Sequence, residues 1–286
     1  MTTRRAFLAG SAALLAAPQV AVAAPEITLP SAPPTGLKQA VTRWPFARMA
    51  WDDFCRMVKR LGFGAVDLVD EGDWATVQRH GLAISTANSS ARRDFIGRGL
   101  NDRANHATIL GELEAVIPKA AAAKIPNVIA MFGNGTRETA AEGIAACAEG
   151  LAKIAPLAER HGVTIVLEML NSKVDHRGFQ GDTTAYGVAV CERVNSARVR
   201  LLYDIYHMQI MEGDVIRTIR AHHRWFAHYH TAGNPGRQEI GDRQELQYPA
   251  IARAIAETGF TGWVAHEFSP AGRADVALRE ARQRMA

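Results

Sequence analysis

The chain has 286 residues, of which 48% are apolar and 7% aromatic, and this composition suits one large α/β domain with a substantial core. The formal net charge is +4, and two of these positive charges belong to Arg4 and Arg5, in a segment that we expect to be removed. The remaining net charge of about +2 gives no electrostatic reason to expect nucleic-acid binding.

Residues 1–23 have the pattern of a twin-arginine signal peptide. Arg4 and Arg5 precede an apolar run of small residues from Ala9 to Ala17, and Ala21-Val22-Ala23 forms a cleavage pattern before Ala24. The apolar run is far shorter than the roughly 20 residues needed to cross a bilayer, so no stable membrane anchor is expected. The sequence therefore predicts a periplasmic protein that the twin-arginine machinery exports.

The three cysteines, Cys55, Cys147 and Cys191, are widely spaced, and each lies in a predicted helix. An odd number without paired spacing supports neither a disulfide framework nor a cysteine zinc site. We expect them to be buried as small apolar side chains.

Residues 24–36 are rich in proline and are predicted to form a linker, and residues 37–286 form the domain. Apolar runs typical of buried parallel strands alternate there with helical patterns. The predicted strands are 38–44, 64–69, 82–88, 127–132, 163–170, 199–206, 226–232 and 263–268. The predicted helices are 51–61, 73–80, 104–123, 137–161, 184–195, 214–222, 248–258 and 274–285. Eight of each predict a single (β/α)₈ TIM barrel. A doubly wound sheet is the alternative, but no Gly-x-Gly-x-x-Gly follows an early strand.

Four residues lie near the C-terminal ends of four predicted strands: Glu168, Asp204, His230 and Glu267. Three carboxylates and an imidazole at these positions can hold one divalent cation above a barrel core, with Mg²⁺ or Mn²⁺ suited best. For each glutamate, the alternative is a salt bridge to an arginine.

Two further side chains are candidates for substrate binding. His207 follows Asp204 by three residues, so the aspartate can end the strand while the histidine begins the next loop and faces the substrate. Arg237 lies in the turn-forming run 233–239 and could bind a carboxylate through two hydrogen bonds. The alternative for Arg237 is a solvated ion pair with Glu239.

The remaining histidines of this half are assigned structural positions. His228 shares a strand face with His230 but lies one layer deeper, where we expect a hydrogen-bonded structural histidine. His222, His223 and His266 are expected at the surface or behind the site.

The segments LEMLN, LYDIYHMQ, HYHTAGNPGRQE followed by ELQYP, and VAHEFSP resemble the hydroxypyruvate isomerase branch of the xylose isomerase-like TIM barrels. The resemblance is close from Val163 to Pro270 and looser before it. It implies that Glu168 and Glu267 bind the metal and act as acid and base. It also implies the remaining roles, which are metal binding by Asp204 and His230 and substrate-oxygen binding by His207 and Arg237.

The expected reaction is the isomerisation of a small hydroxy-keto acid, such as hydroxypyruvate to tartronate semialdehyde, through a cis-enediolate. Hydroxypyruvate isomerases usually have glutamine where His230 stands, whereas ketose 3-epimerases have histidine, and the export signal is foreign to a cytoplasmic pathway. A ketose 3-epimerase and a non-catalytic periplasmic sugar-binding barrel are therefore alternatives. An apurinic endonuclease is disfavoured, because His80 and His106 fall on predicted helices. The exact substrate, the metal and a homo-oligomeric state are left open.

Overall fold

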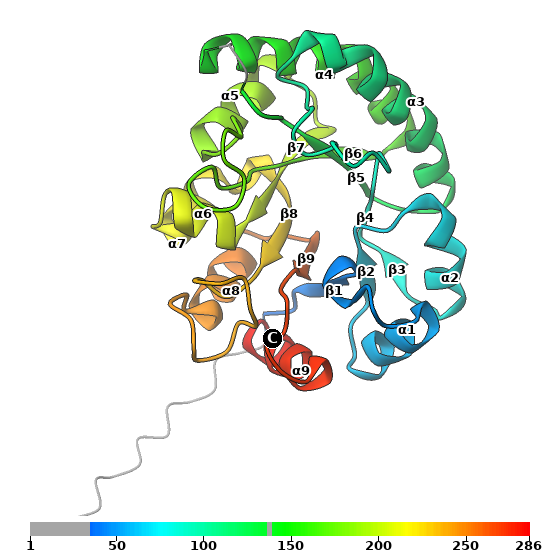
Figure 1. Cartoon of the computed structure of the whole chain (residues 1–286), viewed down its shortest axis with the longest axis vertical. Coiled ribbons are helices and arrows are strands. Elements are labelled where there is room, and N and C mark those ends of the chain that lie inside the picture. Colours follow the sequence, from blue (N-terminus) through cyan, green and yellow to red (C-terminus); the bar gives the residue numbers. More distant parts are fainter. Residues whose placement is uncertain (1–34, 136–138) are drawn as a thin grey trace, which may run out of the picture. The chain divides into compact units, whose positions relative to one another are not determined.

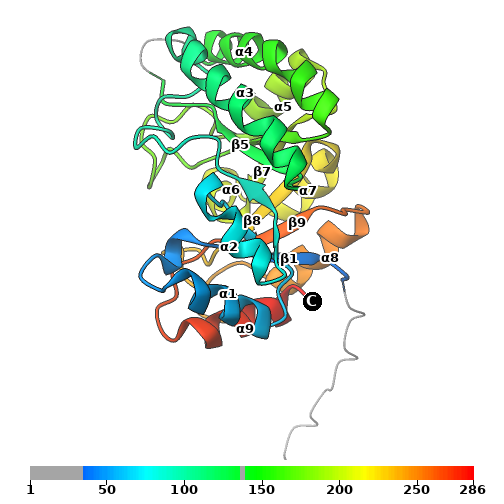
Figure 2. The same cartoon turned by 90° about the vertical axis from the view of Figure 1, so that its right-hand side faces the viewer.

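The computed structural model describes residues 35–135 and 139–286, which form a parallel sheet surrounded by helices (Figures 1 and 2). The predicted signal peptide at 1–23 and nearly all of the predicted linker at 24–36 lie outside the described residues. Within the part that the structure describes, no helix is long and apolar enough to cross a membrane.

All strand pairs of the sheet are parallel, in the order β3-β2-β1-β9-β8-β7-β6-β5-β4. The first and last strands in the chain, β1 and β9, are therefore neighbours, as a barrel requires. The strands are β1 Lys38–Thr42, β2 Ala65–Asp67, β3 Ala83–Ile84, β4 Thr86–Ala87, β5 Asn127–Met131, β6 Thr164–Glu168, β7 Val199–Asp204, β8 Phe226–Thr231 and β9 Trp263–His266.

The helices lie outside the strands and cover the outer face of the sheet (Figure 1). They are α1 Trp51–Arg60, α2 Trp74–Arg79, α3 His106–Ala122, α4 Ala140–His161, α5 Thr184–Val194, α6 Ile205–Met211, α7 Val215–His222, α8 Tyr248–Glu257 and α9 Ala274–Arg284. With both faces covered, β5 and β6 are buried at every residue, which explains their continuous apolar runs.

The predicted third strand, 82–88, is broken at Ser85 into β3 and β4. β3 pairs with β2, and β4 pairs with β5. A parallel bridge between Val69, just after β2, and Ala87 in β4 joins the two ends of the sheet. The (β/α)₈ prediction is thus confirmed, with one of the eight strands in two short pieces.

Helix α6 was not predicted, and its presence corrects the predicted strand 199–206, which ends at Asp204. The Asp204 carboxylate accepts hydrogen bonds from the backbone N–H groups of Tyr206 and His207, at 2.8 and 3.1 Å, and so caps the helix. The apolar residues that follow Asp204 belong to this short helix rather than to the strand. His207 consequently lies on a helix and not at the start of a loop.

The three cysteines are buried and unpaired, as expected. Burial raises the pKa values of the Cys147 and Cys191 thiols to about 12.

Candidate metal and substrate site

The structure brings the four predicted metal ligands together at the C-terminal end of the sheet. Glu168 and Asp204 are the last residues of β6 and β7, His230 is the next to last of β8, and Glu267 directly follows β9. Because the strands are parallel, these positions meet at one end of the barrel. One ligand atom from each residue lies within 4.8 Å of the others.

The His230 imidazole is the centre of this cluster. Its Nδ1 lies 2.8 Å from Glu267 Oε2, 3.2 Å from Glu168 Oε1 and 3.9 Å from Asp204 Oδ2. The two glutamates are 4% exposed, and Asp204 and His230 are fully buried. Water therefore cannot screen these carboxylates, and their charges must be balanced inside the protein.

The pKa shifts reflect this excess of buried negative charge. Burial and the neighbouring Glu267 raise the pKa of Glu168 to about 7, and burial also raises the pKa of Asp204. Burial opposes ionisation of Glu267 too, but His230 and Arg237 hold its pKa below the usual range. Three buried carboxylates and one imidazole at these distances are a suitable donor set for a divalent cation, so the residues fit a metal centre.

Arg237 lies within the carboxylate cluster instead of pairing with Glu239 at the surface. Its guanidinium donates to Asp204 Oδ2 at 3.1 Å and to Glu267 Oε2, and the side chain is only 18% exposed. The Glu239 carboxylate accepts from the backbone of Ala271 at 2.8 Å. Arg237 therefore does not form the solvated ion pair with Glu239 that was the alternative prediction.

His207 and Arg237 lie in direct contact on the wall of the site. The Asn171 backbone N–H donates to His207 Nδ1 at 3.2 Å, while Arg237 Nη1 lies 2.5 Å from His207 Nε2. Burial and Arg237 lower the pKa of His207 well below its ordinary value, so the ring is neutral. With Nδ1 as acceptor, Nε2 carries the proton and lies 3.6 Å from Asp204 Oδ2. His207 and Arg237 are thus both N–H donors, which could bind oxygen atoms of a substrate.

Trp44, which the sequence analysis did not select, also belongs to the site. It lies on a 3₁₀ turn, Trp44–Phe46, that follows β1, and its indole N–H donates to Glu267 Oε1 at 2.6 Å. The Arg237 guanidinium lies 5.9 Å from its ring and 5.0 Å from the ring of Tyr206. Trp44 was missed because the motifs that indicate the site all lie in the second half of the chain.

These groups surround a cavity of about 210 Å³, which is large enough for a small organic substrate. Its lining residues are Trp44, Ile96, Glu168, Leu170, Asp175, His176, His207, Arg237 and Glu267. Four of the six residues that were predicted to bind metal or substrate line it. The other two, Asp204 and His230, lie fully buried beneath it.

Asp67 is a second residue that the sequence analysis missed. It ends β2, is fully buried, and accepts from His230 Nε2 at 2.9 Å and from the Ser85 hydroxyl. Although burial opposes its ionisation, His228 and His230 lower the pKa of Asp67 below its usual range. The signal was present in the sequence, because a lone carboxylate in the apolar run AVDLV has the same pattern that identified Glu168.

Two other histidines are fully buried. His228 has the structural position that was predicted, and its Nε2 lies 3.1 Å from Asp67 Oδ1, although the contact does not meet full hydrogen-bond geometry. His266 is buried and contacts Thr231 Oγ1 at 2.8 Å and Gln39 Oε1 at 3.0 Å, and burial lowers its pKa to about 3. It is neither at the surface nor in contact with the carboxylates described above. His222 and His223 are partly or fully exposed, as expected.

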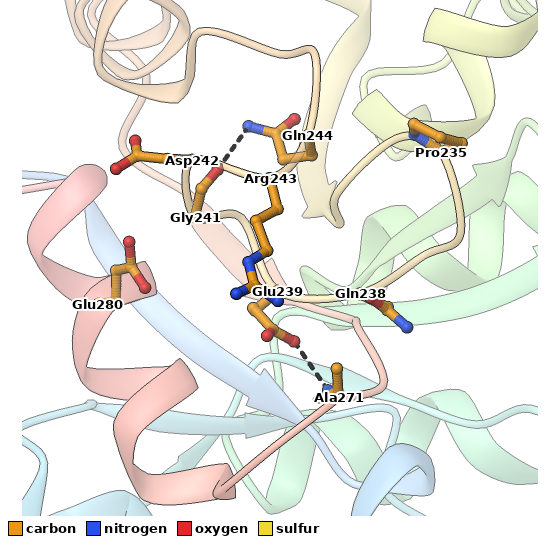
Figure 3. Close-up of a pocket in the computed structure, with 9 residues that line it drawn as sticks. All are labelled: Pro235, Gln238, Glu239, Gly241, Asp242, Arg243, Gln244, Ala271 and Glu280. Carbon is orange, nitrogen blue, oxygen red and sulfur yellow. Dashed lines mark hydrogen bonds between the residues drawn. The ribbon is translucent and has the colours of Figure 1, made fainter.

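A second cavity, of about 290 Å³, lies beside the loop that carries Arg237 (Figure 3). Its acidic side chains are already paired. Glu239 binds the Ala271 backbone, and Arg284 bridges Asp242 and Glu280. The Ser269 N–H also donates to the Arg237 carbonyl at 2.9 Å. These contacts fasten the loop after β8 to the loop after β9, and they hold Arg237 in place.

Comparisons with known proteins agree with this geometry. A model of the xylose isomerase-like TIM barrel family matches residues 55–285. A 2-oxo-tetronate isomerase of Cupriavidus necator is 30% identical over 212 residues, which are 72% of each chain. A hydroxypyruvate isomerase of Escherichia coli is 26% identical over 209 residues, which are 73% of each chain.

Solved structures share the fold at lower identity. A family 2 AP endonuclease from Brucella melitensis has a TM-score of 0.76 and 24% identity, over 85% of this chain and 96% of that one. A D-psicose 3-epimerase from Clostridium cellulolyticum has a TM-score of 0.70 and 17% identity, over 87% of this chain and 99% of that one. At these identities, the likeness shows the fold alone.

Proposed function

Because the chain belongs to the xylose isomerase-like TIM barrel family, we propose that it is a metal-dependent isomerase of a small hydroxy-keto acid, such as hydroxypyruvate or a 2-oxo-tetronate. Family membership confirms the resemblance that the sequence motifs indicated. The two curated relatives confirm the isomerase class, and this removes the support for a non-catalytic barrel. The substrate class and the mechanism are the proposed part.

The observation that carries the proposal is the pair Glu168 and Glu267 on the wall of one small cavity. Moving a carbonyl to the adjacent carbon requires removal of a C–H proton and its return at the neighbouring carbon. Two carboxylates in contact with the same substrate can divide these transfers.

Glu168, Asp204, His230 and Glu267 would hold the divalent cation, with Mg²⁺ or Mn²⁺ favoured by the oxygen-rich donors. When bound, this ion supplies a Lewis acid that polarises the substrate carbonyl. The protein contributes the fixed carboxylates and a buried setting in which water cannot compete.

His207 and Arg237 would bind the substrate oxygens. Both line the cavity with N–H groups, and a substrate carboxylate can accept from both. This supports a keto acid as substrate. Asp175 supports the alternative, because a third acidic group on the cavity wall, 2.9 Å from Tyr206 Oη, favours a neutral polyol. A ketose 3-epimerase, which needs the same two carboxylates, is therefore the runner-up.

Solvent exchange tests the proposal directly. The purified protein, with Mg²⁺ or Mn²⁺, would be incubated in deuterated water with hydroxypyruvate, a 2-oxo-tetronate or D-psicose, and deuterium in substrate and product would be followed by NMR. We expect isomerisation of a keto acid with deuterium incorporation. In Glu168→Gln and Glu267→Gln, turnover should collapse, and only the variant that retains the abstracting carboxylate should still exchange deuterium into the substrate. Substantial turnover in both variants would show that the glutamates are not the acid and base.

A further inference from the structure

A buried carboxylate supports the cluster from below. Asp67 does not line the substrate cavity, yet it contacts His230, the one imidazole among the proposed metal ligands. Its other contacts are the Ser85 hydroxyl and the edge of His228, and all four residues are buried. The role of Asp67 must therefore act through His230.

The two nitrogens of His230 face different partners. Nε2 lies 2.9 Å from Asp67 Oδ2, whereas Nδ1 faces the carboxylates of Glu168 and Glu267 at 3.2 and 2.8 Å. A neutral imidazole has one N–H and one lone pair, and the partner of one nitrogen decides which form is present. An ionised carboxylate only accepts, so Asp67 selects the tautomer with the proton on Nε2. The lone pair of Nδ1 then points at the metal position.

We propose that Asp67 is a positioning residue that makes His230 a metal ligand by fixing its tautomer and ring orientation. This rests on the metal centre of the proposed function. The break in the third strand contributes to the arrangement, because Ser85, between β3 and β4, donates both its backbone N–H and its hydroxyl to β2, to Val66 O and to Asp67. Ser85 thus holds Oδ1 of Asp67, while His230 contacts Oδ2.

The proposal predicts a change in metal preference. Imidazole nitrogen binds a first-row transition-metal ion such as Mn²⁺ better than it binds Mg²⁺, which prefers oxygen. In Asp67→Asn, the neutral amide can turn either its carbonyl oxygen or its N–H group toward Nε2, so the charge that selects the tautomer is lost. The form with the proton on Nδ1, which cannot bind a metal through that nitrogen, then becomes populated. Loss of such a supporting carboxylate typically lowers metal affinity by about 10- to 100-fold. We expect a loss of this size for Mn²⁺ and a smaller loss for Mg²⁺.

The test is calorimetric titration of the metal-free protein with MnCl₂ and with MgCl₂. His228→Gln is the matched control, because it alters another fully buried neighbour of Asp67 but leaves the Asp67–His230 hydrogen bond. The proposal is supported if Asp67→Asn alone loses Mn²⁺ affinity. It is overturned if Asp67→Asn binds Mn²⁺ like the wild type, or if His228→Gln loses as much, since the cause would then be a disturbed core. A wild-type protein that binds neither ion would overturn the metal centre itself, and the inference with it.

A second measurement does not depend on folding of the Asp67 variant. In wild-type protein labelled with ¹⁵N-histidine and saturated with Mg²⁺, the His230 resonances, identified by their loss in His230→Gln, should show a proton on Nε2. A proton on Nδ1 would overturn the proposal.

Discussion

The guanidinium of Arg237 contacts two aromatic rings, two carboxylates and one imidazole, while only 18% of its side chain is exposed. The planar guanidinium group of arginine, with its five N–H donors, can contact all these partners and still present N–H groups to a substrate. The ammonium group of lysine, which is a point charge, cannot. This makes Arg237 the residue that best separates the two candidate functions.

Arg237→Lys should lower kcat/KM for keto acids far more than for neutral ketoses. A charged hydrogen-bond pair in a partly closed site contributes about 2–4 kcal/mol, which corresponds to roughly a 30- to several hundredfold loss. Steady-state kinetics on hydroxypyruvate and on D-psicose would measure the ratio. Equal losses on both substrates would favour the epimerase.

The indole of Trp44 supports Glu267 through a single hydrogen bond, and this can be removed without removing the ring. In Trp44→Phe, the loss of a hydrogen bond to a charged group, about 1.5–3 kcal/mol, should lower kcat by roughly ten- to a hundredfold. KM and thermal stability should change little, since Trp44 is 47% exposed. A fall in stability with unchanged kcat would mean that Trp44 only packs against the barrel.

At the scale of elements, Asp204 has two tasks that substitution can separate. It is a proposed metal ligand, and its Oδ1 caps helix α6. Asparagine caps helices well but carries no charge, whereas alanine does neither. Both Asp204→Asn and Asp204→Ala should lose metal affinity, and the alanine variant should unfold more easily by about a further 1 kcal/mol.

Urea unfolding of the metal-free variants measures the second effect, and calorimetry measures the first. Equal unfolding free energies would show that the cap contributes nothing. Normal metal binding by Asp204→Asn would remove Asp204 from the ligand set.

Most elements could be predicted from the sequence, because apolar runs and helical periodicity are local signals. The exceptions have specific physical causes. Helix α6 depends on a side-chain cap from Asp204, a residue whose position in the sequence also suits the end of a strand. The break at Ser85 arises because β3 pairs with β2 whereas β4 pairs with β5. The six candidate site residues could be predicted because each lies near the end of a predicted strand or in a recognisable motif. Asp67 and Trp44 contact them only through the closed barrel, which brings the first half of the chain against the second.

At the scale of the whole molecule, the cellular location of the protein is a proposal that rests on the sequence of residues 1–23, which lie outside the described residues. We propose that residues 1–23 direct twin-arginine export and that the mature protein begins at Ala24 in the periplasm. Replacing Arg4 and Arg5 by lysine should leave precursor in the cytoplasm, as measured by cell fractionation and immunoblotting. Continued export of this double variant by the same route would contradict the assignment.

The pairing of β1 with β9 also orders events during synthesis of the chain. Glu267 follows β9, whereas Trp44 and Asp67, which support the cluster, lie near β1 and β2. A nascent chain that has not yet emerged from the ribosome past Glu267 has an open sheet and an incomplete ligand set. Closing the ring and completing the set of proposed metal ligands are consequently the same event, so a polypeptide that ends before Glu267 has neither.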